Sequence, residues 1–160
     1  MLDDVCAGMV TDLVHGTTYT AIEGKGSFRN GEKIKPSTTT VLHDAVIGLD
    51  LNTYKVKEII PKLTELIAET KHIRHFGANA LELCYVADGS TDAFVDIRGK
   101  LRTTDVAAAF LIIKEAGGII TTPSNQTVNV ELDPQKTLSF VTSGNLEIHK
   151  KILNLVKSAC

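Results

Sequence analysis

The chain has 160 residues, of which 43% are hydrophobic and 22% are charged. This composition excludes a disordered or fibrous chain and fits one globular domain, because a chain of this length buries roughly 70% of its surface without a disulfide or a structural metal. Seventeen Lys and Arg against nineteen Asp and Glu give a net charge of -2, with no long run of either sign. We therefore expect no electrostatic binding to nucleic acid or to an anionic membrane.

The cysteines and the apolar runs bear on the compartment. Cys6, Cys84 and Cys160 are far apart and form no Cys-x-x-Cys pair, which argues against a disulfide framework or a zinc site. The longest apolar run, Val106 to Ile113, is much shorter than the roughly 20 residues of a membrane helix, and the acidic start lacks the basic head of a signal peptide. We expect a cytoplasmic protein with one domain over residues 1–160 and with cysteines that only fill buried or terminal positions.

The first third of the chain predicts antiparallel strands. Val5–Val14 and Thr17–Ile22 are rich in β-branched residues and are separated by the turn residues His15-Gly16, so they predict a hairpin. Asn30-Gly31 predicts a second turn, of type I′, because both residues tolerate a positive φ. A further strand is expected over Thr40–Leu49.

The apolar spacing becomes helical from residue 54. Pro61 lies in this pattern and lacks a backbone N–H, so it either kinks a helix that begins earlier, which we favour, or occupies the first position of one. The later segments predict alternating elements, which is typical of an α/β fold. They are a strand over Lys71–His75, a helix over Asn79–Ala87, a strand over Thr91–Ile97, a helix over Thr103–Ala116, strands over Ile119–Thr121 and Leu138–Thr142, and a helix over Asn145–Val156.

The helix expected over Thr103–Ala116 carries a candidate site residue. It is apolar on nearly all sides between Val106 and Ile113, so we expect it to be buried. Asp105 lies in its first turn, where the helix dipole and the free backbone donors favour an ionised carboxylate. Two interpretations stay open: Asp105 caps the helix, or it binds Mg²⁺, which prefers oxygen ligands.

Four segments in a fixed order carry recognisable motifs. Arg102–Ala109 contains Asp-x-Ala-Ala and is followed, within Ile113–Gly118, by Glu-Ala-Gly-Gly. Arg74–Ala87, Gly89–Asp96 and Ala21–Gly31 hold further motifs at suitable spacing. These segments resemble the inositol monophosphatase and fructose-1,6-bisphosphatase superfamily, and the resemblance extends over nearly the whole chain.

The resemblance implies a fold and an activity. Residues 97–102 are most similar to archaeal members, which act on inositol monophosphates and on fructose 1,6-bisphosphate. The implied fold is the C-terminal half of the sugar-phosphatase fold, in which antiparallel strands lead into an α/β layered domain. The implied reaction is Mg²⁺-dependent hydrolysis of a phosphate monoester, with a small sugar or inositol phosphate as the partner molecule.

The resemblance also implies roles for single residues. Asp105 takes the place of a metal-binding Asp, although Thr104 stands where the family has Trp. Backbone groups of Gly77, Ala78 and Asn79 would line the substrate.

Three further side chains are implied as substrate contacts. Asp96 takes the place of a Glu that contacts a sugar or inositol hydroxyl, and it is one methylene shorter. Arg74 and Arg98 present the planar guanidinium groups that suit a phosphate, or else they form surface or strand-end ion pairs.

One motif of the superfamily is missing. The chain has no Asp-Pro-x-Asp-Gly-Thr and no Glu-Glu upstream of it, and these supply most metal ligands and the water-activating Thr. We therefore expect the chain to be inactive alone and to bind Mg²⁺ weakly through Asp105. Three hypotheses remain: one half of a phosphatase that needs its N-terminal half, a non-catalytic module that binds a phosphate ligand or a protein, or a site completed in a homo-oligomer. Apolar surface left by a missing half would favour self-association.

Overall fold

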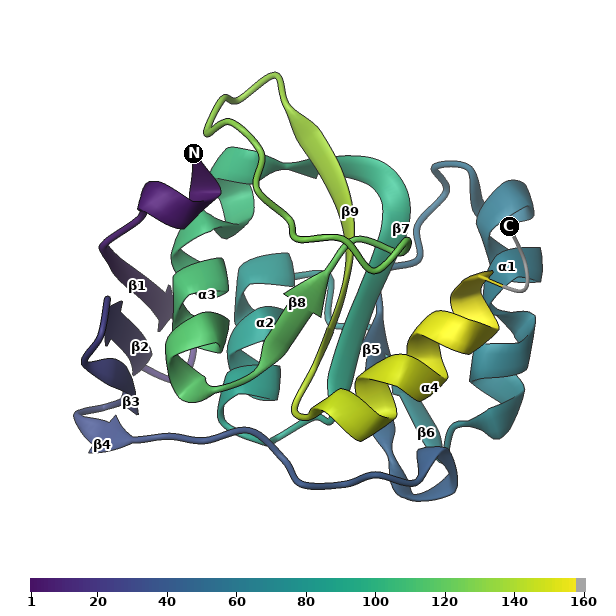
Figure 1. Ribbon diagram of the computed structural model, residues 1–160, viewed down its shortest axis with the longest axis horizontal. Coiled ribbons are helices and arrows are strands. Elements are labelled where there is room, and N and C mark those ends of the chain that lie inside the picture. The colour runs from purple at the N-terminus through teal and green to yellow at the C-terminus, as the bar shows by residue number, and fades with distance from the viewer. Residues whose placement is uncertain (158–160) are drawn as a thin grey trace.

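Two β-sheets and two pairs of helices alternate in four layers (Figure 1). The computed structural model describes residues 1–157, so the expectation for Cys160 lies outside the described residues. Helices α1 (Val56–Glu69) and α4 (Leu146–Lys157) cover one face of a five-stranded sheet. Helices α2 (Asn79–Ala87) and α3 (Thr103–Ala116) cover the other face and also support a four-stranded sheet. This layered arrangement confirms the predicted α/β class with antiparallel strands at its start.

The four-stranded sheet is an antiparallel meander. Its strands are β1 (Ala7–Asp12), β2 (Thr17–Ile22), β3 (Gly26–Arg29) and β4 (Glu32–Lys33), which pair in chain order. The predicted hairpin is confirmed, but its first strand is shorter than Val5–Val14 because the Asp12 carboxylate binds the amides of Val14 and His15 and starts the turn early. The second predicted turn is also confirmed, with φ values of 50° at Asn30 and 84° at Gly31.

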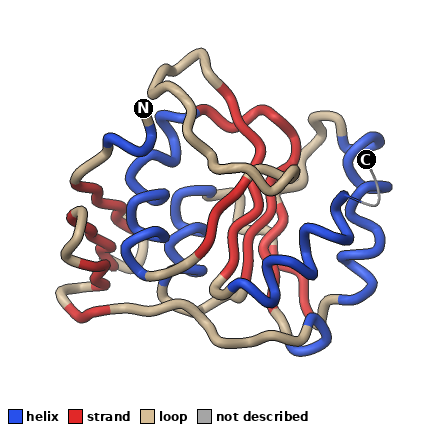
Figure 2. The backbone as a smooth tube through the Cα atoms, viewed as in Figure 1, coloured by secondary structure: helices blue, strands red, loops and turns tan. Residues whose placement is uncertain are grey.

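The five-stranded sheet is mixed, with strand order β6-β5-β7-β9-β8 (Figure 2). Strand β5 pairs in parallel with β6 and β7, whereas β9 is antiparallel to both β7 and β8. The strands are β5 (Val46–Leu49), β6 (His72–Arg74), β7 (Ala93–Arg102), β8 (Ile119–Thr121) and β9 (Thr137–Ser143). The alternating pattern of the sequence thus produces a parallel core of only three strands.

Two predicted strand boundaries are wrong by five residues or more. The strand expected over Thr40–Leu49 begins only at Val46, because the chain makes a 3-10 turn, η2 (Leu42–Asp44), just before it. Ahead of that turn the backbone is held by helix α4, whose Lys151 Nζ donates to the Thr40 carbonyl oxygen at 2.7 Å. In contrast, β7 continues five residues beyond the predicted end at Ile97, after an irregularity in its pairing with β9.

The four predicted helices are present, and the three with predicted bounds shift by at most one residue at either end. Helix α1 begins at Val56 and includes Pro61, so the alternative in which the helix starts at the proline is wrong. Helix α3 ends as predicted at Gly117, which has a φ of 92° and donates its N–H to the Lys114 carbonyl. Within residues 1–157, no helix combines the length and the apolar character needed to cross a bilayer.

Candidate functional site

A pocket of about 340 Å³ opens where β5 and β6 end and where α2 and α3 begin. Carboxyl ends of neighbouring parallel strands share one edge of a sheet, and ligands of α/β proteins commonly bind there. Of the candidate residues, the structure brings Gly77, Asn79, Arg98 and Asp105 together in this pocket. The full lining is Asp50, Asn52, His75, Gly77, Asn79, Arg98, Lys100, Leu101 and Asp105.

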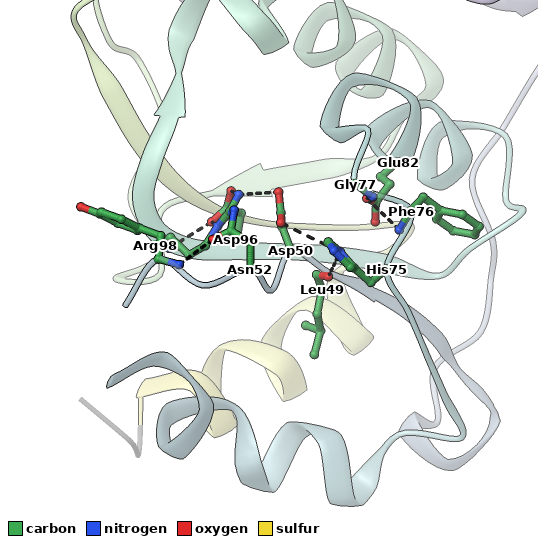
Figure 3. Close-up of polar contacts among 10 residues, drawn as sticks. Leu49, Asp50, Asn52, His75, Phe76, Gly77, Glu82, Asp96 and Arg98 are labelled. Atoms are coloured by element: carbon green, nitrogen blue, oxygen red, sulfur yellow. Dashed lines mark hydrogen bonds and ion pairs between the residues drawn. The ribbon is translucent and has the colours of Figure 1, made fainter. Parts of the chain in front are cut away.

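The floor of the pocket is a buried ion network centred on Arg98 (Figure 3). Arg98 Nε donates to Asp96 Oδ1 at 2.9 Å, and Nη2 donates to Asp96 Oδ2 at 2.7 Å and also to Asp50 Oδ2. Burial acts to lower the pKa of Arg98, but its bonds to the two carboxylates outweigh burial and raise that pKa above its usual range. The guanidinium of Arg98, which lies inside β7, is thus engaged by two carboxylates in buried ion pairs, rather than in the surface or strand-end pair considered from the sequence.

Asp96 lies below the pocket rather than on its surface. Its side chain is fully buried, and it does not belong to the lining. Both of its oxygens accept from Arg98, and Oδ1 also accepts from the Arg98 backbone N–H at 3.0 Å. In this structure Asp96 orients Arg98, and a direct contact with a substrate hydroxyl would require the network to open.

The irregularity in β7 turns side chains toward the pocket. Pairing with β9 runs to Asp96, opposite Phe140, and resumes at Leu101, opposite Leu138. Four residues of β7 therefore face a single residue of β9, and such bulges bend a strand and re-aim its side chains. Lys100 and Arg98, both in this stretch, line the pocket as a result.

The loop between β6 and α2 forms a second wall. His75 lines the pocket, and its Nδ1 bonds to the Leu49 carbonyl at 3.1 Å and lies 3.9 Å from Asp50 Oδ1. Because a carbonyl only accepts, the bond places the proton of His75 on Nδ1. His75 Nε2 is then the ring nitrogen left to meet a ligand.

The predicted backbone contacts of residues 77–79 divide into two groups. The Gly77 N–H donates to Glu82 Oε1 at 3.0 Å, and the Ala78 carbonyl accepts from the Glu82 N–H at 2.9 Å, so both groups are already bonded within the protein. Asn79 opens α2 and lines the pocket, and the amides of a first helical turn have no carbonyl partner within their helix. Donors for a ligand therefore come from the start of α2 rather than from Gly77.

Asp105 sits in the first turn of α3, at the rim of the pocket. Its Oδ2 accepts from Arg102 Nε at 2.9 Å, and this bond raises the pKa of Arg102. No side chain caps the start of α3, so Asp105 does not act as the N-cap considered from the sequence.

The described residues on their own do not fit a magnesium site. Within residues 1–157, no group of three or more His, Cys, Asp or Glu side chains lies close enough together to hold a metal ion. Mg²⁺ in proteins takes near-octahedral oxygen coordination and depends on carboxylates and substrate phosphates. Asp105, with a 37% exposed side chain already paired to Arg102, supplies one such carboxylate.

Arg74 lies outside the pocket, and five lining residues were not predicted. Arg74 is exposed on β6, donates from Nη1 to the Ile73 carbonyl at 3.0 Å and does not line the pocket. The missed residues are Asp50, Asn52, His75, Lys100 and Leu101. Asp50 and Asn52 lie within three residues of Leu49, the predicted end of a strand. The rule that ligands bind beyond the carboxyl ends of strands could therefore have identified them.

Comparison with protein families decides the relationship. The model of the inositol monophosphatase family matches residues 3–159. The chain belongs to the inositol monophosphatase family. This confirms the resemblance drawn from the four motifs.

Relatives of known name include archaeal enzymes. A fructose-1,6-bisphosphatase/inositol-1-monophosphatase of Methanothermobacter thermautotrophicus is 35% identical over 156 residues, which are 98% of this chain and 54% of the relative. A bifunctional NADP phosphatase/NAD kinase of Methanococcus maripaludis is 38% identical over 161 residues, with 96% of this chain and 27% of the relative covered.

Solved structures agree in fold. The extragenic suppressor protein suhB from Bartonella henselae has a TM-score of 0.83 and 29% identity, over 96% of this chain and 57% of that chain. A Pyrococcus horikoshii protein with similarities to inositol-1 monophosphatase has a TM-score of 0.80 and 32% identity, over 92% of this chain and 56% of that one. The chain spans about half the length of these structures and of the Methanothermobacter relative.

Proposed function

We propose that this chain forms the substrate-facing part of a cytoplasmic, Mg²⁺-dependent phosphate monoester hydrolase. The observation that carries the proposal is the pocket that combines Asp105, the start of α2 and the Arg98 floor in a member of this family. Inositol monophosphate and fructose 1,6-bisphosphate are the proposed substrates, because the names of the archaeal relative at 35% identity include both activities.

Residues from outside this chain complete the proposed metal site. The pocket is lined by two carboxylates, Asp105 and Asp50, and Asp50 is already bound to Arg98, whereas Mg²⁺ needs several oxygen ligands. The Methanothermobacter relative is about twice as long as this chain. The additional ligands come from an N-terminal half or, as an alternative, from a second copy of the chain. On this proposal the chain alone does not turn over substrate.

The chain's own side chains bind and orient the ester. The free amides at the start of α2 and the positive end of its dipole suit a phosphate oxygen. Lys100 adds an ammonium group, which lies 4.8 Å from the centre of the Tyr54 ring, whereas Asp50 and Arg98 form a fixed floor. His75 Nε2 is placed to contact a hydroxyl or phosphate oxygen of the ligand.

A second candidate substrate is the 2′-phosphate of NADP. It is favoured by the relative named as a bifunctional NADP phosphatase/NAD kinase, which is 38% identical over 96% of this chain. A non-catalytic module that binds a phosphate ligand remains the alternative to both phosphatase assignments.

The test is phosphate release by the purified chain from inositol 1-phosphate, fructose 1,6-bisphosphate and NADP, with and without Mg²⁺. We expect no release, together with amide NMR shifts at Asn79 and Lys100 when each ester is added. Release that requires Mg²⁺ and is lost in Asp105→Asn would show that the chain or its oligomer holds a complete site. The dependence of mass on concentration would then separate those two cases. Shifts confined to another surface would contradict the proposed pocket.

A further inference from the structure

Glu82 is a buried carboxylate that stands beside the pocket without lining it. It lies one turn into α2 and is 2% exposed. Its Oε1 accepts from the Gly77 N–H at 3.0 Å and from the Phe76 N–H at 3.3 Å (Figure 3). Both donors belong to the loop that joins β6 to α2, so the side chain of a helix holds the backbone of the loop before it.

Among the described residues, the Glu82 side chain has no polar partner outside this loop. Within residues 1–157, Glu82 forms no ion pair, and its Oε2 has no hydrogen-bond partner. Burial raises the pKa of Glu82, and the loop amides act in the opposite direction. A buried acceptor without a partner is costly, so this carboxylate is not explained by a structural salt bridge.

The neighbouring strand leaves room for the carboxylate. A Cβ atom at Gly48 of β5 would lie 2.9 Å from Glu82 Oε2 and 2.9 Å from Phe94 Cδ2. Real Cβ atoms do not approach other atoms so closely, so any larger residue at position 48 would displace both side chains. The glycine therefore preserves the position from which Glu82 reaches the loop.

We propose that Glu82 is a positioning residue that fixes the pocket wall formed by residues 75–79. By taking up the Gly77 N–H, it holds Gly77 at a φ of 72° and directs the chain into α2 with Asn79 at the pocket surface. It also fixes the backbone next to His75, whose ring bonds to the Leu49 carbonyl of the neighbouring strand β5. The effect on a ligand rests on the proposed function, whereas the effect on the loop does not.

The first measurement is amide hydrogen exchange by NMR on the full chain. Glu82→Leu removes the acceptor, and we expect exchange at Gly77 to accelerate by about tenfold or more. Glu82→Gln keeps a carbonyl oxygen in place of Oε1, so it should retain most of the protection. The Gly89 amide, which bonds to the Val86 carbonyl at the far end of α2, is the internal control and should not change.

Gly48→Ala is the second variant, and it leaves Glu82 itself intact. The added Cβ displaces Oε2, so exchange at Gly77 should again accelerate while Gly89 is unchanged. This variant decides the matter if Glu82→Leu does not fold. Unchanged exchange at Gly77 in either folded variant, or an equal loss of protection at Gly89, would overturn the proposal.

Titration with inositol 1-phosphate then connects the loop to binding. We expect the dissociation constant, followed by the Asn79 amide shift, to rise about tenfold in Glu82→Leu and to change little in Glu82→Gln. If the unaltered chain does not bind the ester, the proposed function fails while the exchange result still decides the role of Glu82. Equal binding by a Glu82→Leu variant that has lost protection at Gly77 would contradict the link to the ligand.

Discussion

Two arginine–carboxylate contacts border the same pocket, and one is buried whereas the other is exposed to solvent. Arg98 and Asp96 have side-chain exposures of 4% and 0%, whereas Arg102 and Asp105 have exposures of 58% and 37%. Removing charges from water is costly, so a buried pair is expensive to break, while an exposed pair gains little and is screened by salt. The comparison indicates that the Arg98 network is a rigid support, and we propose that Asp105 exchanges its arginine for another cation.

The largest expected effect comes from breaking the buried network. Arg98→Met leaves Asp50 and Asp96 buried without their partner, so we expect the free energy of unfolding to fall by about 3–5 kcal/mol. Urea titration followed by circular dichroism measures this loss. Arg102→Met is the matched control, and equal losses in the two variants would remove the distinction drawn here.

His149 is a further buried ionisable group, and it tests how burial acts on a charge that has no ionic partner. His149 is 1% exposed between Ser143 and Thr121, and burial lowers its pKa from 6.5 to about 4. Below pH 6.5 the unfolded chain binds a proton that the folded chain does not, so this contribution to stability is present above pH 6.5 and declines as the pH falls toward 4.

Unfolding in urea at pH 7 and pH 5 tests this dependence. The unaltered chain should lose roughly 2 kcal/mol more between these values than His149→Gln does. The variant serves as the control because every other titrating group is common to both proteins. Equal losses of stability in the two proteins would show that His149 becomes protonated in the folded chain by pH 5.

The smallest effect is expected at the exposed pair. Asp105→Asn removes the charge from the contact with Arg102, yet the urea midpoint should stay within experimental error because water solvates both groups. Raising the salt concentration should likewise leave the difference between Asp105→Asn and the unaltered chain undetectable. A clear loss of stability would mean that Asp105 supports the fold, and its proposed exchange of partners would then lack a basis.

Local patterns were sufficient to predict most of the fold. The four helices were predicted from the helical spacing of apolar residues, and the hairpin turns from Gly and Asn. Both signals depend only on residues that are close together in the chain. The failures have long-range causes. The strand before Leu49 is shortened where Lys151 holds the Thr40 carbonyl, and no local pattern contains a contact between residues 111 positions apart.

The candidate site was predicted in part for the same reason. Gly77, Asn79, Arg98 and Asp105 were named through motifs, and all four line the pocket. Asp50 carries no motif, and its role depends on the buried guanidinium of a residue 48 positions away. Burial of that kind is visible only once the strands are paired.

The position of β9 has a consequence for the order in which the chain assembles during synthesis. This strand lies between β7 and β8, although it is the last of the three to be made. Until residues 137–143 leave the ribosome, β8 has no neighbour in the sheet and β7 has one open edge. We therefore expect a nascent chain that stops before residue 137 to remain protease-sensitive, with the sheet closing only when its late interior strand arrives.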